Sequence, residues 1–170
     1  MKTMKILAGA LFFVLFLAAG AKAQEREGEG LDALFEATMM DLHGEPMTLS
    51  HFRGKPLIVH FWSRLCFPCR EEFPEFIALQ KKYKKRGLTV LGIALEEDPV
   101  KVREFLVAYE VDYPAALVGE QGIPLMEALG NDKALLPFTL LIDRRGEVVL
   151  RKHGIFRKSD FQGVADKLLR

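Results

Sequence analysis

Residues 56–62, PLIVHFW, form an almost uninterrupted apolar run, and three residues later the chain carries the motif C-x-x-C. The run is rich in β-branched and aromatic residues, which predicts a strand buried on both faces, as inside an α/β sheet. After Cys66 the apolar residues recur at helical spacing from Phe73 to Tyr83, and Gly87 ends the pattern. A buried strand that leads into an amphipathic helix favours the α/β class of folds.

The same alternation of strand and helix continues along the chain. Residues 88–95 predict a second buried strand, and Asp98-Pro99 predicts the start of a helix, because proline suits the first helical position. Other predicted elements are short strands at 38–42 and 47–49 around a turn at 43–46, a helical turn at 50–54, a strand at 113–117, a helix at 124–129, strands at 137–142 and 147–151 joined by a turn at 143–146, and a last helix, 160–169, capped by Ser159. We therefore expect one layered α/β domain with a parallel, right-handed first crossover.

The N-terminus has the pattern of a targeting segment. Two lysines precede the uncharged apolar run 6–20, and residues 21–23 supply the small-x-small pattern that signal peptidase accepts. We expect a secretory signal peptide over 1–23, cleaved before Gln24. The alternative is an uncleaved membrane anchor, although the apolar run is shorter than the roughly 20 residues that a spanning helix needs.

Removal of the leader leaves 147 of the 170 residues, enough for one domain with its own core. We expect residues 24–36, which begin polar and rich in glycine, to be a flexible lead-in, and residues 37–170 to form the domain. Three lysines are lost with the leader, so the mature chain has 21 basic and 23 acidic residues and a formal charge of −2. This balance gives no electrostatic reason to bind nucleic acid or an anionic membrane surface.

The two cysteines, Cys66 and Cys69, are the only ones in the chain. Outside the cytoplasm a disulfide between them can persist, but it encloses only two residues and would stabilise the fold little, since the entropic gain grows with loop length. Free N–H groups and the dipole at a helix N-terminus stabilise a thiolate, which is the nucleophile. We expect Cys66 to attack and Cys69 to resolve, with Pro68 in the first helical turn and Phe67 as an apolar lip beside the exposed sulfur.

A metal site is the alternative use of this cysteine pair. Structural zinc takes four ligands, often as two spaced pairs, whereas this chain has one pair and four scattered histidines: His43, His51, His60 and His153. We therefore expect no zinc site and no bound metal, while copper delivery with His60 or His153 as a third ligand stays open. Arg70 stands where haem attachment requires a histidine.

Four segments resemble, in order, the exported thiol-disulfide oxidoreductases of the TlpA/ResA type, which have a thioredoxin fold. They are HGEPMTLSHFRGKP (43–56), KPLIVHFWSRLCFPCREEFPEF (55–76), within it REEFPEF (70–76), and LPFTLLIDRRGEVV (136–149). The resemblance covers nearly all of the mature chain. It implies a thioredoxin-like α/β fold: a central mixed sheet flanked by helices, with an N-terminal β-hairpin extension.

The resemblance also implies roles for individual residues. Pro137 would be a cis-proline that faces the cysteines, and the backbone of Leu136 would pair with an extended substrate. Pro74 would kink the first active-site helix, and Trp62 would pack beside the site. Glu72 would handle protons or tune the thiols; the alternative is a solvated helix residue.

The sequence also departs from the related families. His60 stands six residues before the first cysteine, where cytoplasmic thioredoxins place a buried aspartate. It is either a hydrogen-bonded core residue or a group that exchanges a proton with the second cysteine. Leu136 and Phe67 are uncommon at their positions, which leaves the substrate open. Val59 stands where peroxiredoxins carry a proline, so peroxidase activity is not expected.

The resemblance implies an exported protein-disulfide reductase, periplasmic or on the outer face of the cytoplasmic membrane. Its redox centre is the Cys66–Cys69 dithiol, and no organic cofactor is expected. Its partners would be disulfide-bearing proteins, for example cytochrome c precursors, and a membrane thiol electron donor; we expect a monomer and no nucleic acid. The alternatives are a copper-binding chaperone that uses the same thiols and a disulfide-forming oxidant of the same fold.

Overall fold

The computed structural model describes residues 28–170, so the expected leader, 1–23, lies outside the described residues. The strands are β1 (Thr38–Asp41), β2 (Pro46–Thr48), β3 (Leu57–Trp62), β4 (Thr89–Ala94), β5 (Ala115–Leu117), β6 (Phe138–Ile142) and β7 (Val148–His153). The helices are α2 (Phe67–Arg70), α3 (Phe73–Tyr83), α4 (Pro99–Ala108), α5 (Gly122–Ala128), α6 (Lys158–Gln162) and α7 (Ala165–Leu168), with 3-10 turns η1 (Ser50–Phe52), η2 (Lys84–Arg86) and η3 (Gly119–Gln121). Residues 28–36 are also helical.

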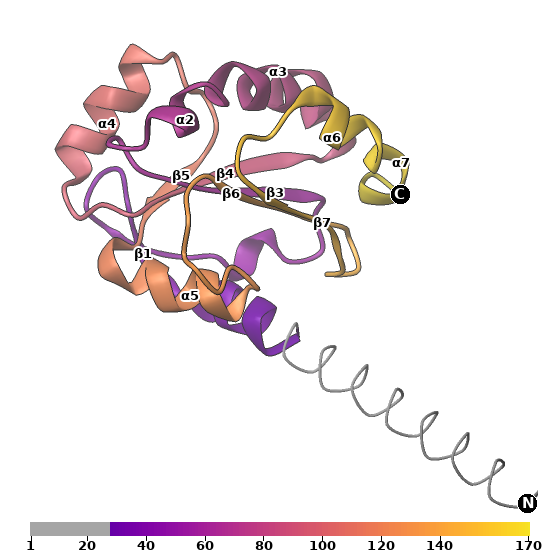
Figure 1. Cartoon of the computed structure of the whole chain (residues 1–170), viewed down its shortest axis with the longest axis horizontal. Helices are drawn as coiled ribbons and strands as arrows, with labels where there is room; N and C mark the ends of the chain where they lie inside the picture. Colours follow the sequence, from indigo (N-terminus) through magenta and orange to yellow (C-terminus); the bar gives the residue numbers. More distant parts are fainter. Residues whose placement is uncertain (1–27) are drawn as a thin grey trace, which may run out of the picture.

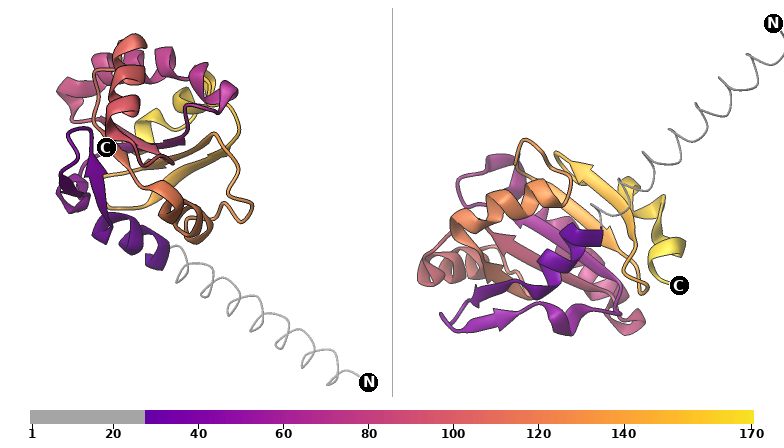
Figure 2. Two further views of the ribbon diagram at one scale, coloured as in Figure 1. Left: turned by 90° about the vertical axis from the view of Figure 1, so that its left-hand side faces the viewer. Right: turned by 90° about the horizontal axis from the view of Figure 1, so that it is seen from below.

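Within residues 28–170, one seven-stranded mixed sheet has the order β2-β1-β5-β4-β3-β6-β7. Helices α3, α4 and α6 cover one face, and α5 and the helix 28–36 cover the other (Figures 1 and 2). The expected mixed sheet, flanked by helices and extended by the β1–β2 hairpin, is confirmed. In this part of the chain no helix is long and apolar enough to cross a membrane.

β3 is the strand that positions the rest of the molecule. All six of its residues are buried, it runs parallel to β4 and antiparallel to β6, and the parallel first crossover is thus confirmed. Its side chains alternate between two core layers, with Ile58 and Trp62 facing α3 and α4, and Val59 and Phe61 facing α5. A strand covered on both faces explains the continuous apolar run in the sequence.

The start of α4 confirms the prediction from Asp98-Pro99. Asp98 Oδ1 accepts hydrogen bonds from the backbone N–H groups of Val100 and Lys101, both at 3.1 Å. The hydrogen bond from the backbone of Lys101 is the largest cause of an Asp98 pKa below its usual value. The charged carboxylate is thus the form that caps the helix.

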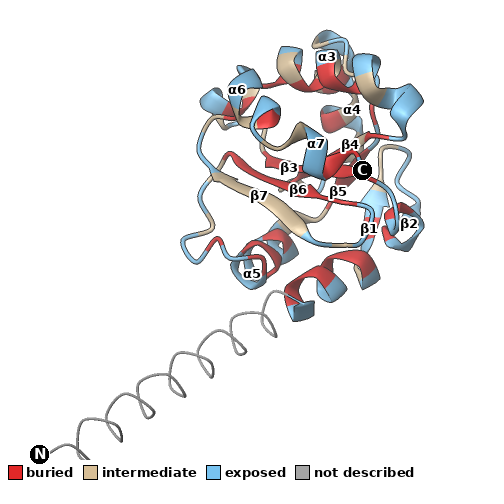
Figure 3. Ribbon diagram, turned by 90° about the vertical axis from the view of Figure 1, so that its right-hand side faces the viewer, coloured by how far each residue is buried: buried red, intermediate tan, exposed pale blue. Residues whose placement is uncertain are grey.

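The expectation of a flexible lead-in is corrected for residues 28–36. These residues are helical, and Leu31, Leu34 and Phe35 are buried in the core layer that also contains α5 (Figure 3). Gly30 packs so closely on α5 that a side chain there would collide with the backbone of Ala128. The glycines that suggested flexibility include one that permits close packing.

The last predicted helix is also corrected. In place of one helix over 160–169 capped by Ser159, the structure has two short helices, α6 and α7, and Ser159 lies inside α6. Arg157 is the N-cap residue, and its N–H donates to Asp160 Oδ2 at 2.8 Å. The interruption falls at Gly163, a residue that disfavours continuation of a helix.

Candidate active site

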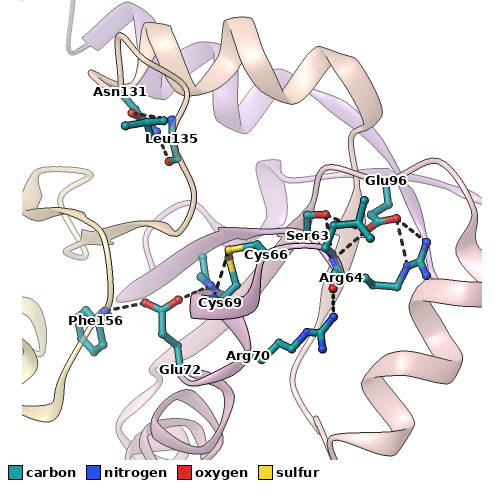
Figure 4. The surroundings of a disulfide bond; sticks show 12 residues. Ser63, Arg64, Cys66, Cys69, Arg70, Glu72, Glu96, Asn131, Leu135 and Phe156 are labelled. Carbon is teal, nitrogen blue, oxygen red and sulfur yellow. Dashed lines mark hydrogen bonds and ion pairs between the residues drawn. A yellow bond between two sulfur atoms is a disulfide. The ribbon is translucent and has the colours of Figure 1, made fainter.

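The two cysteines lie where β3 ends and α2 begins, and they are joined by a disulfide with Cα atoms 5.3 Å apart (Figure 4). Cys66 is the N-cap residue of α2, and its Sγ accepts a hydrogen bond from the N–H of Cys69 at 3.3 Å. Pro68 lies in the first turn of α2, as expected. Cys66 is half-buried, whereas Cys69 is 0 % exposed. A second protein can therefore reach Cys66 but not Cys69.

Glu72 and His60 meet directly beneath the disulfide. Glu72 is fully buried, so it is not the solvated helix residue of the alternative. Its Oε2 lies 3.0 Å from His60 Nε2, and its Oε1 accepts a hydrogen bond from the N–H of Phe156 at 2.6 Å (Figure 4). One ligating atom each of His60, Glu72 and Cys69 lie within 4.8 Å of one another. The structure thus brings together three of the residues that the sequence singled out.

Trp62 packs in the same core layer as Cys69, as the resemblance implies. It is fully buried, and its ring lies 5.1 Å from that of Phe73 and 5.5 Å from that of Phe105. Tyr113 is buried nearby in this layer. Burial first, and then the charge of Glu72, raises the pKa of the Tyr113 hydroxyl well above its usual value. The Tyr113 hydroxyl therefore stays protonated near neutral pH.

Pro137 has the cis peptide bond that the resemblance implies. The Leu136–Pro137 peptide bond is cis, Pro137 is buried and Leu136 is half-buried. Phe138 pairs with Phe61 in the sheet. Pro137 therefore lies one step beyond the paired residues of β3 and β6, at the edge of the sheet from which the cysteine loop departs. Phe67 is 68 % exposed, as its predicted position on the rim requires.

The polar network that holds the loop before Cys66 was not predicted from the sequence. Glu96, just after β4, accepts hydrogen bonds through Oε1 from Ser63 Oγ at 3.0 Å and Arg64 N at 2.7 Å. Its Oε2 accepts from the Arg64 guanidinium at 2.9 and 3.1 Å. Their positions could have indicated this contact, because Ser63 and Arg64 follow β3 and Glu96 follows β4. Residues that follow neighbouring parallel strands meet at one edge of the sheet. Asn131 and the backbone of Phe156 were also missed, and neither gave a signal in the sequence.

The sequence and the fold match known proteins. The model of the Redoxin family matches residues 18–168. The thiol-disulfide oxidoreductase ResA of Bacillus cereus is 29% identical over 163 residues, which are 96% of this chain and 91% of that protein. ResA of Bacillus subtilis is 31% identical over 144 residues, 85% of this chain and 77% of that protein.

Among solved structures, a thiol:disulfide interchange protein of the thioredoxin family from Chlorobium tepidum superposes with a TM-score of 0.68. It is 27% identical in sequence, and the match covers 79% of this chain and 93% of that one. The thioredoxin-like fold expected from the sequence is thereby confirmed.

Proposed function

This chain belongs to the Redoxin family and is a thiol-disulfide oxidoreductase, and from that premise we propose that it reduces disulfides in proteins outside the cytoplasm. The observation that carries the proposal is the difference in exposure between the two sulfur-bearing residues. Cys66 is half-buried at the N-terminus of α2, and Cys69 is fully buried behind it. An incoming disulfide can therefore be attacked by Cys66 alone, and Cys69 is held in reach of the resulting bond.

The reaction consists of two exchanges. The Cys66 thiolate attacks one sulfur of the substrate disulfide, that bond breaks, and the other substrate sulfur leaves as a thiolate. The Cys69 thiolate then attacks Cys66 Sγ and releases the first substrate sulfur. The substrate gains two electrons and, from the dithiol or the solvent, two protons, and the enzyme ends with the Cys66–Cys69 disulfide. No organic cofactor is required, because the electrons pass between sulfurs.

The buried Cys69 needs a proton acceptor inside the protein before it can attack. The pair beneath it, Glu72 and His60, is the nearest group of the described residues that can serve, because ligating atoms of all three lie within 4.8 Å of one another. We assign proton handling to this pair. We assign a supporting role to Trp62, which packs in the same layer, and to Pro68, which opens α2.

Substrate binding is assigned to the rim of the site. Leu136, next to cis-Pro137, would pair through its backbone with an extended segment around the substrate cysteine, which is a form of strand addition. Phe67 would contact the same segment through its exposed ring.

The location and partners follow from the sequence and from the relatives. The leader over 1–23 supports export to the periplasm or to the outer face of the cytoplasmic membrane. By resemblance to ResA, we propose cytochrome c precursors as substrates and a membrane thiol protein as the electron donor that regenerates the dithiol. We propose that the protein acts as a monomer.

The assignment of attacker and resolver is tested by trapping. We expect Cys69→Ser to accumulate a mixed disulfide between Cys66 and a substrate protein in cells, because the resolving thiol is missing. Non-reducing electrophoresis followed by mass spectrometry identifies the complex. Cys66→Ser is the matched control and should trap nothing. Trapping by Cys66→Ser alone would reverse the assignment.

The direction of electron flow is tested by the reduction potential of the Cys66–Cys69 pair, measured by equilibration with graded thiol buffers. A value near that of thioredoxin, about −270 mV, is expected of a reductase, whereas a value near −120 mV, roughly that of DsbA, would identify a disulfide-forming oxidant. The second outcome would overturn the proposed direction and leave the thiol chemistry intact.

One observation favours a second candidate function, metal carriage by the reduced protein. His60, Cys69 and Glu72 form the only cluster of possible metal ligands in the described residues. Cys69 Sγ is part of a disulfide here, so only the reduced protein could use it as a ligand. A copper chaperone is expected to bind one Cu(I) tightly and to reduce protein disulfides poorly. Rapid reduction of insulin disulfides without stoichiometric copper binding would exclude it.

A further inference from the structure

Asn131 lies in the segment that joins α5 to β6, and its side-chain amide forms two hydrogen bonds with the backbone of Leu135. Its Nδ2 donates to the carbonyl oxygen of Leu135 at 2.8 Å, and its Oδ1 accepts from the Leu135 N–H at 3.3 Å (Figure 4). The remaining amide hydrogen has a partner in Met126 Sδ, at 3.7 Å. Asn131 is 2 % exposed. It therefore binds Leu135 in both directions, as a neighbouring β-strand would.

These bonds close residues 131–135 into a fixed arch. The N–H of Ala134 donates to the carbonyl of Asn131 at 2.8 Å, and the N–H of Asn131 donates to Met126, which anchors the arch on α5. Ala134 has φ of 45°, a left-handed conformation that a residue with a side chain rarely adopts. Such a conformation persists only where the surroundings hold it, and the Asn131 bonds on either side of it do so.

The arch leaves the Leu135 side chain exposed to solvent, on the loop that leads into cis-Pro137. Leu135 is 61 % exposed, and it is drawn among the surroundings of the Cys66–Cys69 bond in Figure 4. Leu65, next to Cys66, is 87 % exposed, and Phe67 is 68 % exposed. We call Leu65, Phe67 and Leu135 the apolar rim. They are three of the seven large exposed hydrophobic residues in the described chain, and they include the residues on both sides of Cys66.

Two charged groups near the disulfide, Arg64 and Glu72, already have partners. Arg64 forms an ion pair with Glu96 at 2.9 Å, and Glu72 contacts His60. A charged substrate residue that approaches Arg64 or Glu72 would thus compete with an existing partner, whereas an apolar residue would cover the apolar rim. The exposed apolar rim therefore favours apolar side chains next to the substrate cysteine.

We propose that Asn131 is a positioning residue that sets substrate preference through Leu135. By binding both backbone polar groups of Leu135, it withholds them from a bound polypeptide, and it fixes the Leu135 side chain as a contact for the residue that flanks the substrate cysteine. The partner that fits is an extended, disulfide-bearing polypeptide with apolar residues next to its cysteines. This inference rests on the proposed function, because it requires a substrate disulfide at Cys66.

The test compares two disulfide-linked peptides of equal length, with leucine or with serine on each side of the cysteine. Oxidised lipoamide, which has no flanking residues, reports the thiol chemistry alone. We expect the reduced wild-type protein to reduce the leucine peptide about tenfold faster than the serine peptide, since the contact buries the exposed part of Leu135. We expect Leu135→Ser and Asn131→Ala to bring this ratio close to one.

Two further variants complete the design. Asn131→Asp keeps an acceptor for the Leu135 N–H but cannot donate to the Leu135 carbonyl, so it tests the clamp if Asn131→Ala folds poorly. Val107→Ser is the matched control, because Val107 is 71 % exposed but belongs to α4 and not to the apolar rim. The control is expected to keep the wild-type ratio.

Each outcome separates the parts of the inference. An unchanged ratio in Leu135→Ser, or equal rates in the wild type, overturns the apolar contact, while lipoamide reduction shows that the proposed function stands. If the preference for the leucine peptide disappears in Leu135→Ser but remains in both Asn131 variants, Asn131 does not set the preference. A wild type that reduces neither peptides nor lipoamide overturns the proposed function and, with it, this inference.

Discussion

At the scale of single residues, the carboxylate of Glu72 connects parts of the chain that are far apart in sequence. It contacts His60 on β3, 12 residues earlier, and the N–H of Phe156, 84 residues later. All three groups are buried, so His60 Nε2 and the Phe156 N–H have Glu72 as their partner in place of water. A buried polar group that loses its partner recovers no bond to water, which makes the removal of Glu72 costly.

We expect Glu72→Ala to lower the free energy of unfolding of the oxidised protein by about 2–5 kcal/mol. The substitution leaves His60 Nε2 and the Phe156 N–H buried without the hydrogen-bond partner that Glu72 supplies. Glu72→Gln can accept from Phe156 through its oxygen and donate to His60 through its amide, so its loss should be only about 1 kcal/mol. Urea unfolding at neutral pH measures both. Equal losses would show that the charge of Glu72, and not its hydrogen bonds, stabilises the site.

The residues of the site differ in how far the sequence could predict them. Cys66 and Cys69 were predictable because their spacing and their position after a buried strand are local features. The contact between His60 and Glu72 was not, because it joins two elements and depends on how α3 packs on the sheet. Asn131 gave no signal, since a lone asparagine in a loop is typical of ordinary turns.

At the scale of elements, the loop between β3 and α2 has a defined conformation although it has no regular structure. The carboxylate of Glu96 accepts four hydrogen bonds from Ser63 and Arg64, and the Leu65 N–H donates to Ser63 Oγ at 3.2 Å. The Arg70 side chain, from α2, donates to the carbonyl of Arg64. Loops that carry functional residues are positioned by the scaffold beneath them, and here the scaffold acts through the end of β4.

We expect Glu96→Ala to release this loop, because one substitution removes all four hydrogen bonds. Hydrogen exchange at the Arg64 amide, whose N–H donates to Glu96 Oε1 at 2.7 Å, should accelerate by about tenfold or more. Glu97→Ala is the control, since Glu97 is adjacent and exposed. If the Arg64 amide exchanges at the same rate in both variants, Glu96 does not hold the loop.

The elements themselves were predictable where a periodic apolar pattern has a clear stop signal. β3, β4 and the start of α4 follow this rule, and the structure confirms them. The prediction failed at 28–36 because glycine and acidic residues hide the spacing of Leu31, Leu34 and Phe35. It also failed in the last helix, where Gly163 was taken for a residue inside a helix and instead separates α6 from α7.

At the scale of the whole molecule, the sheet separates two core layers with different tasks. The layer beneath α3 and α4 contains Trp62 and Cys69, and it supports the disulfide. The opposite layer contains the helix 28–36 and α5, and it reaches the site through the strands of the sheet, through Leu136 and through the arch that Asn131 anchors on α5. The mixed sheet flanked by helices and the N-terminal hairpin followed from the resemblance, whereas the order of the strands and the place of the helix 28–36 came only from the structure.

This division predicts that the opposite layer can be weakened without loss of thiol chemistry. Leu34 is 0 % exposed in the helix 28–36, so Leu34→Ala should lower the free energy of unfolding by about 2–5 kcal/mol through the cavity it leaves. The rate of lipoamide reduction by the folded protein should stay that of the wild type, because the Cys66–Cys69 layer is untouched. Urea unfolding and the rate are measured on the same samples.

Glu36→Ala is the matched control, because Glu36 lies in the same helix and is exposed, and it should change neither quantity. A fall in the rate of lipoamide reduction in Leu34→Ala, under conditions where the protein remains folded, would show that the two layers are coupled through the sheet. A loss of stability no larger than that of the control would mean that the helix 28–36 contributes little to the core. The expected result, a loss of stability with an unchanged rate, follows because the helix covers only the face away from the disulfide.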